Sequence, residues 1–438
     1  MTKRKKRTTS ELIEEPLKIP IDMGKAQRIS ISRLEKDIIE LGKIGRREDG
    51  GIYRMAFSDA DIEARRWLIE KGESVGLRAS MDPAANVFLL DDRSKTNSSF
   101  MIGSHLDSVP CGGMIDGTLG VLVALECMRV IRENDIELSE NLELVATSDE
   151  EGRFGGMLGS QAICGELSMD FIRRAKDVNE VSLIDAMKKH NLNAINVLKA
   201  KRHREYLSGF LELHIEQGPV LEKTKCDIGI VEDISGLFKW KVKLIGEANH
   251  SGTTPMNMRR DSFQGLAEFA HEIPRLLEEN GSEYARATIG KVDLFPGNPH
   301  TVPGVTEFTI VGRDFDDEHM QEIENACRKT ISAICRRRGL MFEFEELSRL
   351  SPTACDQRMV SLIEGEAQKL NLKYMRMKSG AGHDAQIFGR HIPSGMIFIP
   401  SLNGVSHSPE EWSSLEHIEM GANLLLRSIL RSLAPHVL

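Results

Sequence analysis

The chain has 438 residues and a formal net charge of −9, so nucleic acid is not an expected partner. Its 40% hydrophobic and 28% charged residues are typical of a soluble globular protein, and no apolar run reaches the roughly 18 residues of a membrane-spanning helix. The length exceeds the ~250 to 300 residues at which a single hydrophobic core stops growing, so we expect two domains.

The N-terminus, residues 1–28, has no hydrophobic periodicity and opens with a basic run from Lys3 to Arg7. Polar residues follow this run where a secretory signal would have an apolar stretch. We interpret the segment as a disordered, solvated tail. The seven cysteines form no CxxC pair, and their odd number argues against a disulfide framework. We therefore expect the protein in the reducing cytoplasm.

The folded part begins with a helix, because Ile31, Leu34, Ile38 and Leu41 recur at helical spacing. After it, apolar patterns predict strands and helices in alternation. The expected strands are residues 86–90, 100–104, 142–147 and 209–213, and an apolar helix is expected over residues 121–131. Such alternation predicts an α/β fold with a mixed, mostly parallel sheet flanked by helices.

Residues 236–348 follow a different pattern, typical of a ferredoxin-like α+β domain. The expected order is strand 239–245, helix 262–279, strand 287–294, strand 306–312, helix 318–338 and strand 340–345. A strand at 395–400 and a helix at 414–433 then resume the first pattern. We therefore expect one α/β domain in two pieces, residues 29–235 and 349–438, with residues 236–348 inserted between them.

Polar side chains follow three of the predicted strands at the point where each strand ends. His105 follows the first, the acids from Asp149 to Glu151 follow the second, and His214 ends the third. Ligand sites of open α/β sheets lie at the carboxyl ends of the strands. The topology therefore predicts that these three groups converge.

The loop after the first of these strands contains His105, Asp107 and Asp116 among glycines. Imidazole binds ions such as zinc, nickel or cobalt, a nearby aspartate could bridge two of them, and Asp107 could orient the His105 ring from outside. A loop of this kind is by itself weak evidence, because most are ordinary turns.

Three consecutive acids, Asp149, Glu150 and Glu151, end the next strand. Their mutual repulsion is costly unless a cation neutralises them, although a solvated acidic loop is the simpler interpretation. Adjacent glutamates also permit a division of labour, in which one binds a metal and the other takes a proton from water. The pattern does not say which glutamate does which.

Two further histidines, His214 and His407, complete the set. A lone histidine is more often structural than a metal ligand. Several clusters of His, Asp and Glu at strand ends of one chain are much less easily explained by coincidence.

The chain closely resembles the hydantoinase/carbamoylase branch of the M20 two-metal peptidase clan in the stretches GSHLDSVPCGGMIDG, SDEEG, LELHIEQGPVLE, GEANHSGTTPM, SGAGHDA and GVSHSPEEW. The resemblance runs from about residue 30 to the C-terminus. The branch includes N-carbamoyl-L-amino acid amidohydrolases, allantoate amidohydrolases and β-ureidopropionases, and HIEQGP separates it from the peptidases of the clan.

This resemblance implies two divalent metal ions per subunit, bound by five side chains. Asp116 matches the bridging carboxylate, His105 and His214 match terminal ligands, and Glu151 and His407 complete the shell of the second ion. Such ligands accept zinc, manganese, cobalt or nickel, so the sequence does not identify the metal. Glu150 matches the general acid/base of the family.

The resemblance also implies residues that recognise a small carboxylate substrate. His250 matches a histidine of the inserted domain that stabilises the oxyanion. Arg313 matches the arginine that binds the substrate carboxylate, for which its planar fork is suited. Gln217 and His383 match polar residues of the pocket. The inserted domain acts in the family as a lid through which two subunits form a homodimer.

One segment departs from the family pattern. The usual PNxxNVIPG reads here from Pro296 to Gly304 with His300 in place of the second asparagine. Asn298 lies two residues away and is a candidate to replace it. The departure leaves the identity of the substrate open.

The sequence therefore predicts a metal-dependent amidohydrolase that cleaves the carbamoyl or ureido C–N bond of an N-carbamoyl-L-amino acid or similar ureido carboxylate. The nearest alternatives are an allantoate amidohydrolase and a β-ureidopropionase, which would share the metal site. A dipeptidase or aminoacylase is a more distant alternative. A non-catalytic metal-binding interaction protein is the alternative from another class.

Overall fold

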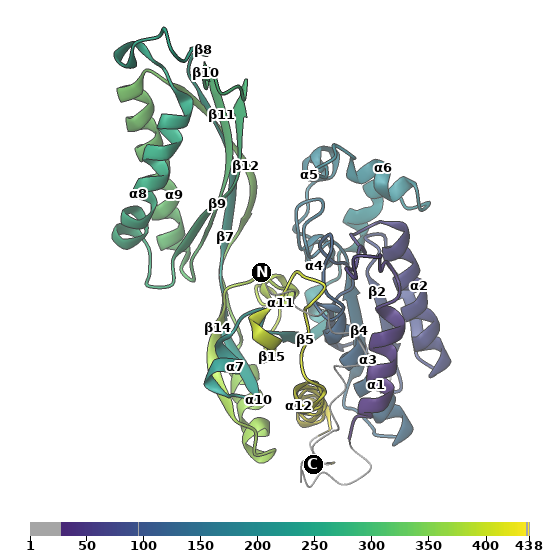
Figure 1. Cartoon of the computed structure of the whole chain (residues 1–438). Helices are drawn as coiled ribbons and strands as arrows, with labels where there is room; N and C mark the ends of the chain where they lie inside the picture. The colour runs from purple at the N-terminus through teal and green to yellow at the C-terminus, as the bar shows by residue number, and fades with distance from the viewer. Residues whose placement is uncertain (1–27, 95, 435–436, 438) are drawn as a thin grey trace.

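The computed structural model describes residues 28–94, 96–434 and 437 (Figure 1). The predicted basic tail therefore lies outside the described residues, apart from Arg28. Two separate sheets account for most of the strands, and each sheet has its own hydrophobic core.

The larger sheet has nine strands in the order β1-β2-β4-β3-β5-β15-β6-β13, with β14 paired to β6. Its four neighbouring strands β4, β3, β5 and β15 are all parallel. Every residue of β3 and β4 is buried, as expected for strands covered on both faces. The strands are β1 (Arg78–Met81), β2 (Val87–Asp91), β3 (Ser99–His105), β4 (Asn141–Thr147), β5 (Leu207–Ile215), β6 (Ile228–Ile234), β13 (Thr353–Ala354), β14 (Tyr374–Ser379) and β15 (Ser394–Ile399).

Long helices pack against this sheet. The central helix α3 is buried along almost its whole length, because it lies against β3 and is covered by α1 and α12. The long helices are α1 (Ile31–Leu41), α2 (Asp59–Ser74), α3 (Thr118–Glu133), α10 (Gln357–Lys369) and α12 (Leu415–Leu433). The short ones are α4 (Leu158–Cys164), α5 (Met169–Arg174), α6 (Leu183–Lys188), α7 (Val220–Thr224) and α11 (Asp384–Phe388), with 3-10 turns η3 (Ala194–Ala200), η4 (Arg204–Tyr206) and η6 (Leu402–Gly404).

Serine side chains fix where several of these helices begin. Ser30 accepts a hydrogen bond from the backbone N–H of Arg33, and Ser414 accepts one from that of His417. Each bond satisfies a donor that the first helical turn leaves without a partner. The first and last long helices of the described chain, α1 and α12, are both capped in this way.

The smaller sheet is antiparallel, with the order β12-β7-β11-β9, and α8 and α9 pack on one of its faces. Buried residues alternate with partly buried or exposed ones along β7, and with partly buried ones along β11, which is typical of a sheet covered on one side. The elements are β7 (Leu237–Ile245), β8 (Asn249–His250), η5 (Met256–Met258), α8 (Ser262–Asn280), β9 (Arg286–Phe295), β10 (Thr301–Val302), β11 (Val305–Arg313), α9 (Asp317–Arg338) and β12 (Met341–Leu350).

Figure 1 shows this smaller part standing apart from the larger sheet, with α8 and α9 on the side turned away from it. The predicted fold class is confirmed, because a parallel central sheet flanked by helices accompanies a separate α+β unit. Among the described residues, no helix combines the length and the apolar character that crossing a bilayer requires.

Candidate metal centre

The carboxyl ends of β4, β3, β5 and β15 meet at one edge of the larger sheet. His105 is the last residue of β3, and Glu150 and Glu151 follow the end of β4. His214 lies near the end of β5, and His407 follows β15 after a short loop. The convergence predicted from the strand ends is therefore present in the structure.

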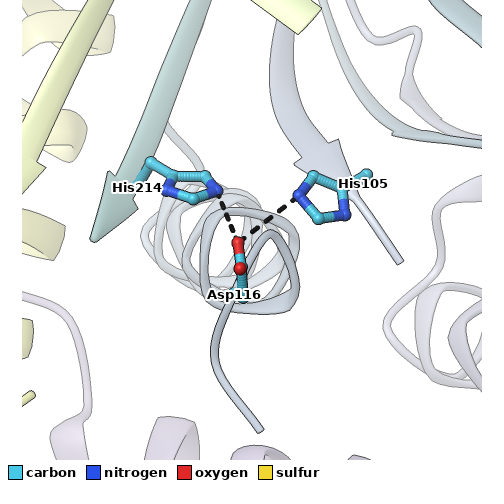
Figure 2. Close-up of side chains that lie close together, drawn as sticks. All are labelled: His105, Asp116 and His214. Carbon is cyan, nitrogen blue, oxygen red and sulfur yellow. Dashed lines mark ion pairs between the residues drawn. The ribbon is translucent and has the colours of Figure 1, made fainter. Parts of the chain in front are cut away.

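Asp116 lies at the centre of this group, in the loop that leads from β3 into α3. Its Oδ1 atom is 3.1 Å from His214 Nε2 and 3.7 Å from His105 Nε2. Figure 2 shows the two imidazole rings on either side of the carboxylate, with the dashed lines meeting at one oxygen. These three buried side chains can offer three ligand atoms to one metal ion.

A second triad uses the other oxygen of the same carboxylate. Asp116 Oδ2 is 3.2 Å from His407 Nε2, and this nitrogen is 3.5 Å from Glu151 Oε2. The atoms of Asp116, Glu151 and His407 also lie close enough together to bind one ion. Because each oxygen of Asp116 belongs to a different triad, the carboxylate is placed to bridge two ions.

The histidine tautomers support a cation at the first triad. His105 Nδ1 lies 3.0 Å from the carbonyl oxygen of Asp107, and His214 Nδ1 lies 2.8 Å from that of Ile215. A carbonyl only accepts hydrogen bonds, so each Nδ1 must carry the proton. In the neutral rings both Nε2 lone pairs then face the Asp116 carboxylate, an arrangement that a metal ion would make favourable. The residues present therefore fit a metal.

Two buried carboxylate oxygens at the site, Asp116 Oδ1 and Glu151 Oε1, accept no hydrogen bond from the described residues. A buried oxygen without a donor is costly, and a bound cation is one way to satisfy it. Burial raises the pKa of Glu151 to about 7, with repulsion from Asp116 as the next cause. Both observations indicate a site with an excess of negative charge, which a bound cation would neutralise.

Glu150 lies outside the two triads around Asp116, but its carboxylate forms a third group of possible ligands with His105 and Glu151. Its Oε2 atom is 3.7 Å from His105 Nε2. Burial is the largest cause that raises the pKa of Glu150 well above its ordinary value, and the Glu151 carboxylate adds to it. A carboxylate with a raised pKa next to a metal site is suited to accept a proton and return it.

Asp107 holds the loop that contains the two glutamates. Its carboxylate accepts hydrogen bonds from the backbone N–H groups of Glu150, at 3.3 Å, and of Glu151, at 3.2 Å. The predicted contact with the His105 ring is made by the main-chain carbonyl of Asp107 and not by its carboxylate. Asp107 thus positions the His105 ring at the end of β3 and the loop with the two glutamates after β4.

Three residues at the site have left-handed backbone conformations that non-glycine residues rarely adopt. The φ angle is 53° at Asp149, 58° at Gln217 and 53° at His407. Such conformations cost free energy and often occur at functional sites. Here each lies in a turn directly beside a candidate ligand or at one.

Glu411 is a residue whose role the sequence did not predict. Its Oε1 accepts hydrogen bonds from the backbone N–H groups of Asp116 and Ile115, and its Oε2 accepts from Ser406 Oγ and the His407 N–H. The buried carboxylate therefore fixes the two loops that carry Asp116 and His407. The only sequence signal was its place in the GVSHSPEEW stretch, four residues after His407.

Two of the predicted substrate residues lie directly at the metal centre. Gln217 Nε2 donates to Asp116 Oδ2 at 3.0 Å. The His383 ring is 4.5 Å from the His214 ring between centroids, and its Nε2 contacts Ser379 Oγ at 3.0 Å. Burial lowers the pKa of His383 well below its ordinary value, so this ring is neutral.

A cavity of about 320 Å³ joins this centre to the smaller sheet. Arg313, at the end of β11, lines it and donates from Nη1 to the carbonyl oxygen of Gly380 at 3.0 Å. Burial lowers the pKa of Arg313, and Glu150 is the one charge that opposes this. The cavity is lined from the smaller part by Leu237, Lys239, Val311, Arg313, Ser348 and Leu350.

The other predicted residues of the smaller part, His250, Asn298 and His300, do not line this cavity. His250 lies in β8, which pairs with β10. Figure 1 shows both strands at the end of the smaller part that is farthest from the larger sheet. Asn298 accepts a hydrogen bond from the backbone N–H of His300 in the loop before β10. Within one chain, the structure does not bring these three residues to the metal centre.

A protonated ligand must lose its proton before it binds a metal, so the pKa values of the ligands predict how metal affinity depends on pH. The Asp116 carboxylate raises the pKa of His407 to about 9. Since this is above the ordinary value, His407 stays protonated up to about pH 9 and must lose its proton to bind a metal. Nearby carboxylates also raise the pKa of His105 and His214, so we expect the metal affinity of the metal-free protein to rise at least about tenfold per pH unit from pH 7 to pH 9. Calorimetry with zinc measures this, and an affinity that is constant from pH 7 to 9 would refute it.

Comparisons with known proteins find similar sequences and a similar fold. The model of peptidase family M20/M25/M40 matches residues 101–431. An N-carbamoyl-L-amino-acid amidohydrolase of Pseudomonas sp. (strain NS671) is 34% identical, over 93% of this chain and 99% of the relative. An allantoate amidohydrolase of Bacillus subtilis (strain 168) is 33% identical, over 91% and 97%. The crystal structure of an amidase of the hydantoinase/carbamoylase family from Burkholderia vietnamiensis superposes with a TM-score of 0.83 at 30% identity, covering 95% of this chain and 98% of that one.

Proposed function

Because this chain belongs to the M20/M25/M40 peptidase family, we propose that it hydrolyses the carbamoyl or ureido C–N bond of an N-carbamoyl-L-amino acid or a similar small ureido carboxylate. The observation that carries the proposal is the pair of triads that share Asp116, with Glu150 beside them. Relatives that match nearly the whole chain are named as amidohydrolases of such compounds.

The two triads would hold two divalent ions, with His105 and His214 on one, Glu151 and His407 on the other, and Asp116 between them. Ions held there would polarise the scissile carbonyl and make water nucleophilic at neutral pH. The mixed nitrogen and oxygen donors accept zinc, manganese, cobalt or nickel. The protein's own part is to fix the ligands and to move protons.

Glu150 is the residue that we assign to proton transfer. Its raised pKa allows it to take a proton from the attacking water and to return that proton to the leaving nitrogen. Its backbone is held by Asp107, so the carboxylate needs little reorganisation during the reaction. The bond that breaks joins the carbonyl carbon to the terminal nitrogen, which leaves as ammonia. The oxygen of the water stays on the carbonyl carbon, and the resulting N-carboxy amino acid decomposes to the amino acid and carbon dioxide.

Arg313 is placed to bind the carboxylate of the substrate. Its guanidinium lines the cavity opposite the metal centre and forms no ion pair with an acid among the described residues. A partly buried arginine without a carboxylate partner is suited to bind one from a ligand, and its planar fork favours two parallel hydrogen bonds. Gln217 and His383 would line the same pocket.

We further propose that two chains form a homodimer through the smaller part, which then acts as a lid. The strand β9 is a ten-residue edge of the smaller sheet and exposes Val292, Leu294 and Phe295. An edge strand with exposed apolar residues can pair with another chain. Pairing of two β9 strands would place the far end of each lid nearer to the other subunit.

A dimer would also give His250 a role. The Nδ1 atom of His250 accepts hydrogen bonds from the backbone N–H groups of Gly252 and Thr253, so its Nε2 carries the proton. A fixed N–H donor of this kind is suited to stabilise an oxyanion. Because His250 lies far from the metal centre of its own chain, we propose that it serves the site of the partner subunit, together with Asn298 or His300.

Mixing two inactive variants tests this exchange. We expect His250→Ala and Glu150→Gln homodimers each to be nearly inactive. After the two are mixed and allowed to exchange subunits, half of the dimers are mixed, and each of these has one site with both residues intact. Ammonia release should then return to about a quarter of the wild-type rate. If both residues act within one chain, mixing restores nothing, and the proposal of a shared site is wrong.

The allantoate amidohydrolase alternative is favoured by the nearly equal identity of the Bacillus subtilis relative. A panel of substrates decides between the candidates. Metal-loaded protein is incubated with N-carbamoyl-L-amino acids, N-carbamoyl-β-alanine and allantoate, and ammonia is measured, while dipeptides are tested for amine release. We expect ammonia from at least one ureido substrate and no amine from dipeptides. Hydrolysis of dipeptides alone would overturn the proposal.

We place the enzyme in the cytoplasm. All seven cysteines are free thiols in the structure, and four of them are buried. Burial raises the pKa of Cys164 well above its ordinary value and that of Cys355 to about 12, so these thiols are poorly reactive. Free thiols in this number are typical of a reducing compartment.

A further inference from the structure

Three lysines alternate along β7 on the face of the smaller sheet that the helices leave open. Lys241 Nζ lies 3.2 Å from Glu307 Oε2. Lys243 Nζ lies 3.9 Å from the same glutamate and 4.0 Å from Glu343 Oε2. Within the described part of the chain, Lys239 has no acid at ion-pair distance. It is the one lysine of the three without a negative partner.

The register of the sheet explains the difference. Lys243 lies opposite Glu307 on β11 and Glu343 on β12. Lys239 lies opposite Val311 and Ser348, which are uncharged. A lysine whose charge is not needed within the sheet is free to serve a ligand.

Lys239 is also the lysine that lines the cavity at the metal centre. Arg313, two residues beyond Val311 on the neighbouring strand, lines the same cavity. The acids of the lining are Asp116, Glu150 and Glu151, and all three lie on the opposite wall, in the candidate metal centre. Among the described residues that line the cavity, those of the smaller part therefore include two cations and no acid.

One cation is enough for a substrate with one carboxylate. Arg313 is the more buried of the two and is suited to bind the carboxylate beside the ureido group. Lys239 lines the same cavity with an exposed side chain, and its long, flexible stem can reach a second anionic group. The pair matches a substrate with two carboxylates.

We infer that Lys239 is a specificity-determining residue that binds a second carboxylate, so that the preferred substrates are N-carbamoyl-amino acids with an acidic side chain. This inference rests on the proposed ureido hydrolysis and narrows its substrate class. N-carbamoyl-L-aspartate and N-carbamoyl-L-glutamate have the required two carboxylates. The same C–N bond of the ureido group is cleaved in both of these substrates, and the same residues surround it.

Matched pairs of substrates test the inference, because an amide has the shape of the acid without its charge. We expect the wild-type kcat/KM for N-carbamoyl-L-glutamate to exceed that for N-carbamoyl-L-glutamine about tenfold, mainly through KM. Lys239→Met should remove this preference, because it weakens the binding of N-carbamoyl-L-glutamate and leaves that of N-carbamoyl-L-glutamine unchanged. Lys239→Arg should retain the preference. Lys241→Met is the control, because Lys241 lies on the same face of β7, forms an ion pair and does not line the cavity.

Binding supplies a second measurement that does not depend on turnover. Calorimetry with the Glu150→Gln protein should show that glutarate binds about tenfold more tightly than butyrate, and that Lys239→Met in the same background removes the difference. Equal turnover of the acid and amide substrates by wild type would overturn the inference while leaving ureido hydrolysis intact. So would an unchanged acid preference in Lys239→Met. Failure to release ammonia from any ureido substrate would instead refute the proposed function.

Discussion

The Glu150→Gln variant should lose about a thousandfold in kcat while it keeps its metal ions. Glutamine has the size and hydrogen-bonding capacity of glutamate but cannot accept the proton of the attacking water, and general acid–base catalysis contributes about 10² to 10⁴ in rate. Glu150 lies outside the two triads that share Asp116, and glutamine keeps a side-chain oxygen for the third group, with His105 and Glu151, so we expect the metal content to stay unchanged. Steady-state ammonia release and metal analysis of the same sample measure both effects.

The neighbouring glutamate provides the matched control. Glu151 is part of the triad with Asp116 and His407, so Glu151→Gln should weaken metal binding, and added metal should restore part of its activity. Added metal should not restore Glu150→Gln. A Glu150→Gln protein that turns over near the wild-type rate would show that another group transfers the proton.

Replacing Asp116 with alanine should remove both metal ions and lower activity by more than about a thousandfold. The reason is geometric, because Oδ1 faces His105 and His214 while Oδ2 faces His407. No other carboxylate among the described residues belongs to both of these triads. Metal analysis after gel filtration and the unfolding temperature with and without added zinc are the measurements.

His407→Ala is the comparison for this variant. It removes a ligand from the second triad and leaves His105, Asp116 and His214 in place, so we expect the first ion to remain. The rise in unfolding temperature on adding metal should persist in part in His407→Ala and disappear in Asp116→Ala. An Asp116→Ala protein that retains both ions would contradict the bridging role.

Much of the fold could be predicted because hydrophobic periodicity is strong in this chain. The helix expected over residues 262–279 is α8, Ser262–Asn280, and the strand expected over residues 306–312 is β11, Val305–Arg313. The smaller sheet has one open face, which leaves a regular alternation along its strands. The short helices between Leu158 and Tyr206 were not predicted, since segments of three to seven residues carry too little periodic signal.

The convergence of the metal ligands could be predicted from strand ends, but their separate roles could not. Parallel strands place His105, Glu150 and His214 at one edge whatever the details of packing. The directions of the two glutamate side chains decide which of them binds metal. These directions depend on a turn in which Asp149 has a left-handed backbone, and residue spacing does not reveal them. From the sequence, only the family resemblance assigns separate roles to the two glutamates.

Other features depend on contacts that no local pattern reveals. Glu411 satisfies backbone N–H groups of a loop almost 300 residues earlier in the chain, so only the folded structure shows its role. His250 and His300 lie far from the metal centre of their own chain, and the role that we propose for them requires a second subunit. Likewise, the register of three strands explains why Lys239 forms no ion pair with the described residues.

A metal titration with product analysis tests the central claim most directly. Protein stripped by a chelator receives a divalent metal in steps, and ammonia released from an N-carbamoyl-L-amino acid is measured at each step. We predict no ammonia without metal and a rate that rises to a plateau at two ions per chain. Full ammonia release by the stripped protein, or a plateau at which no ureido substrate is cleaved, would contradict a two-metal amidohydrolase.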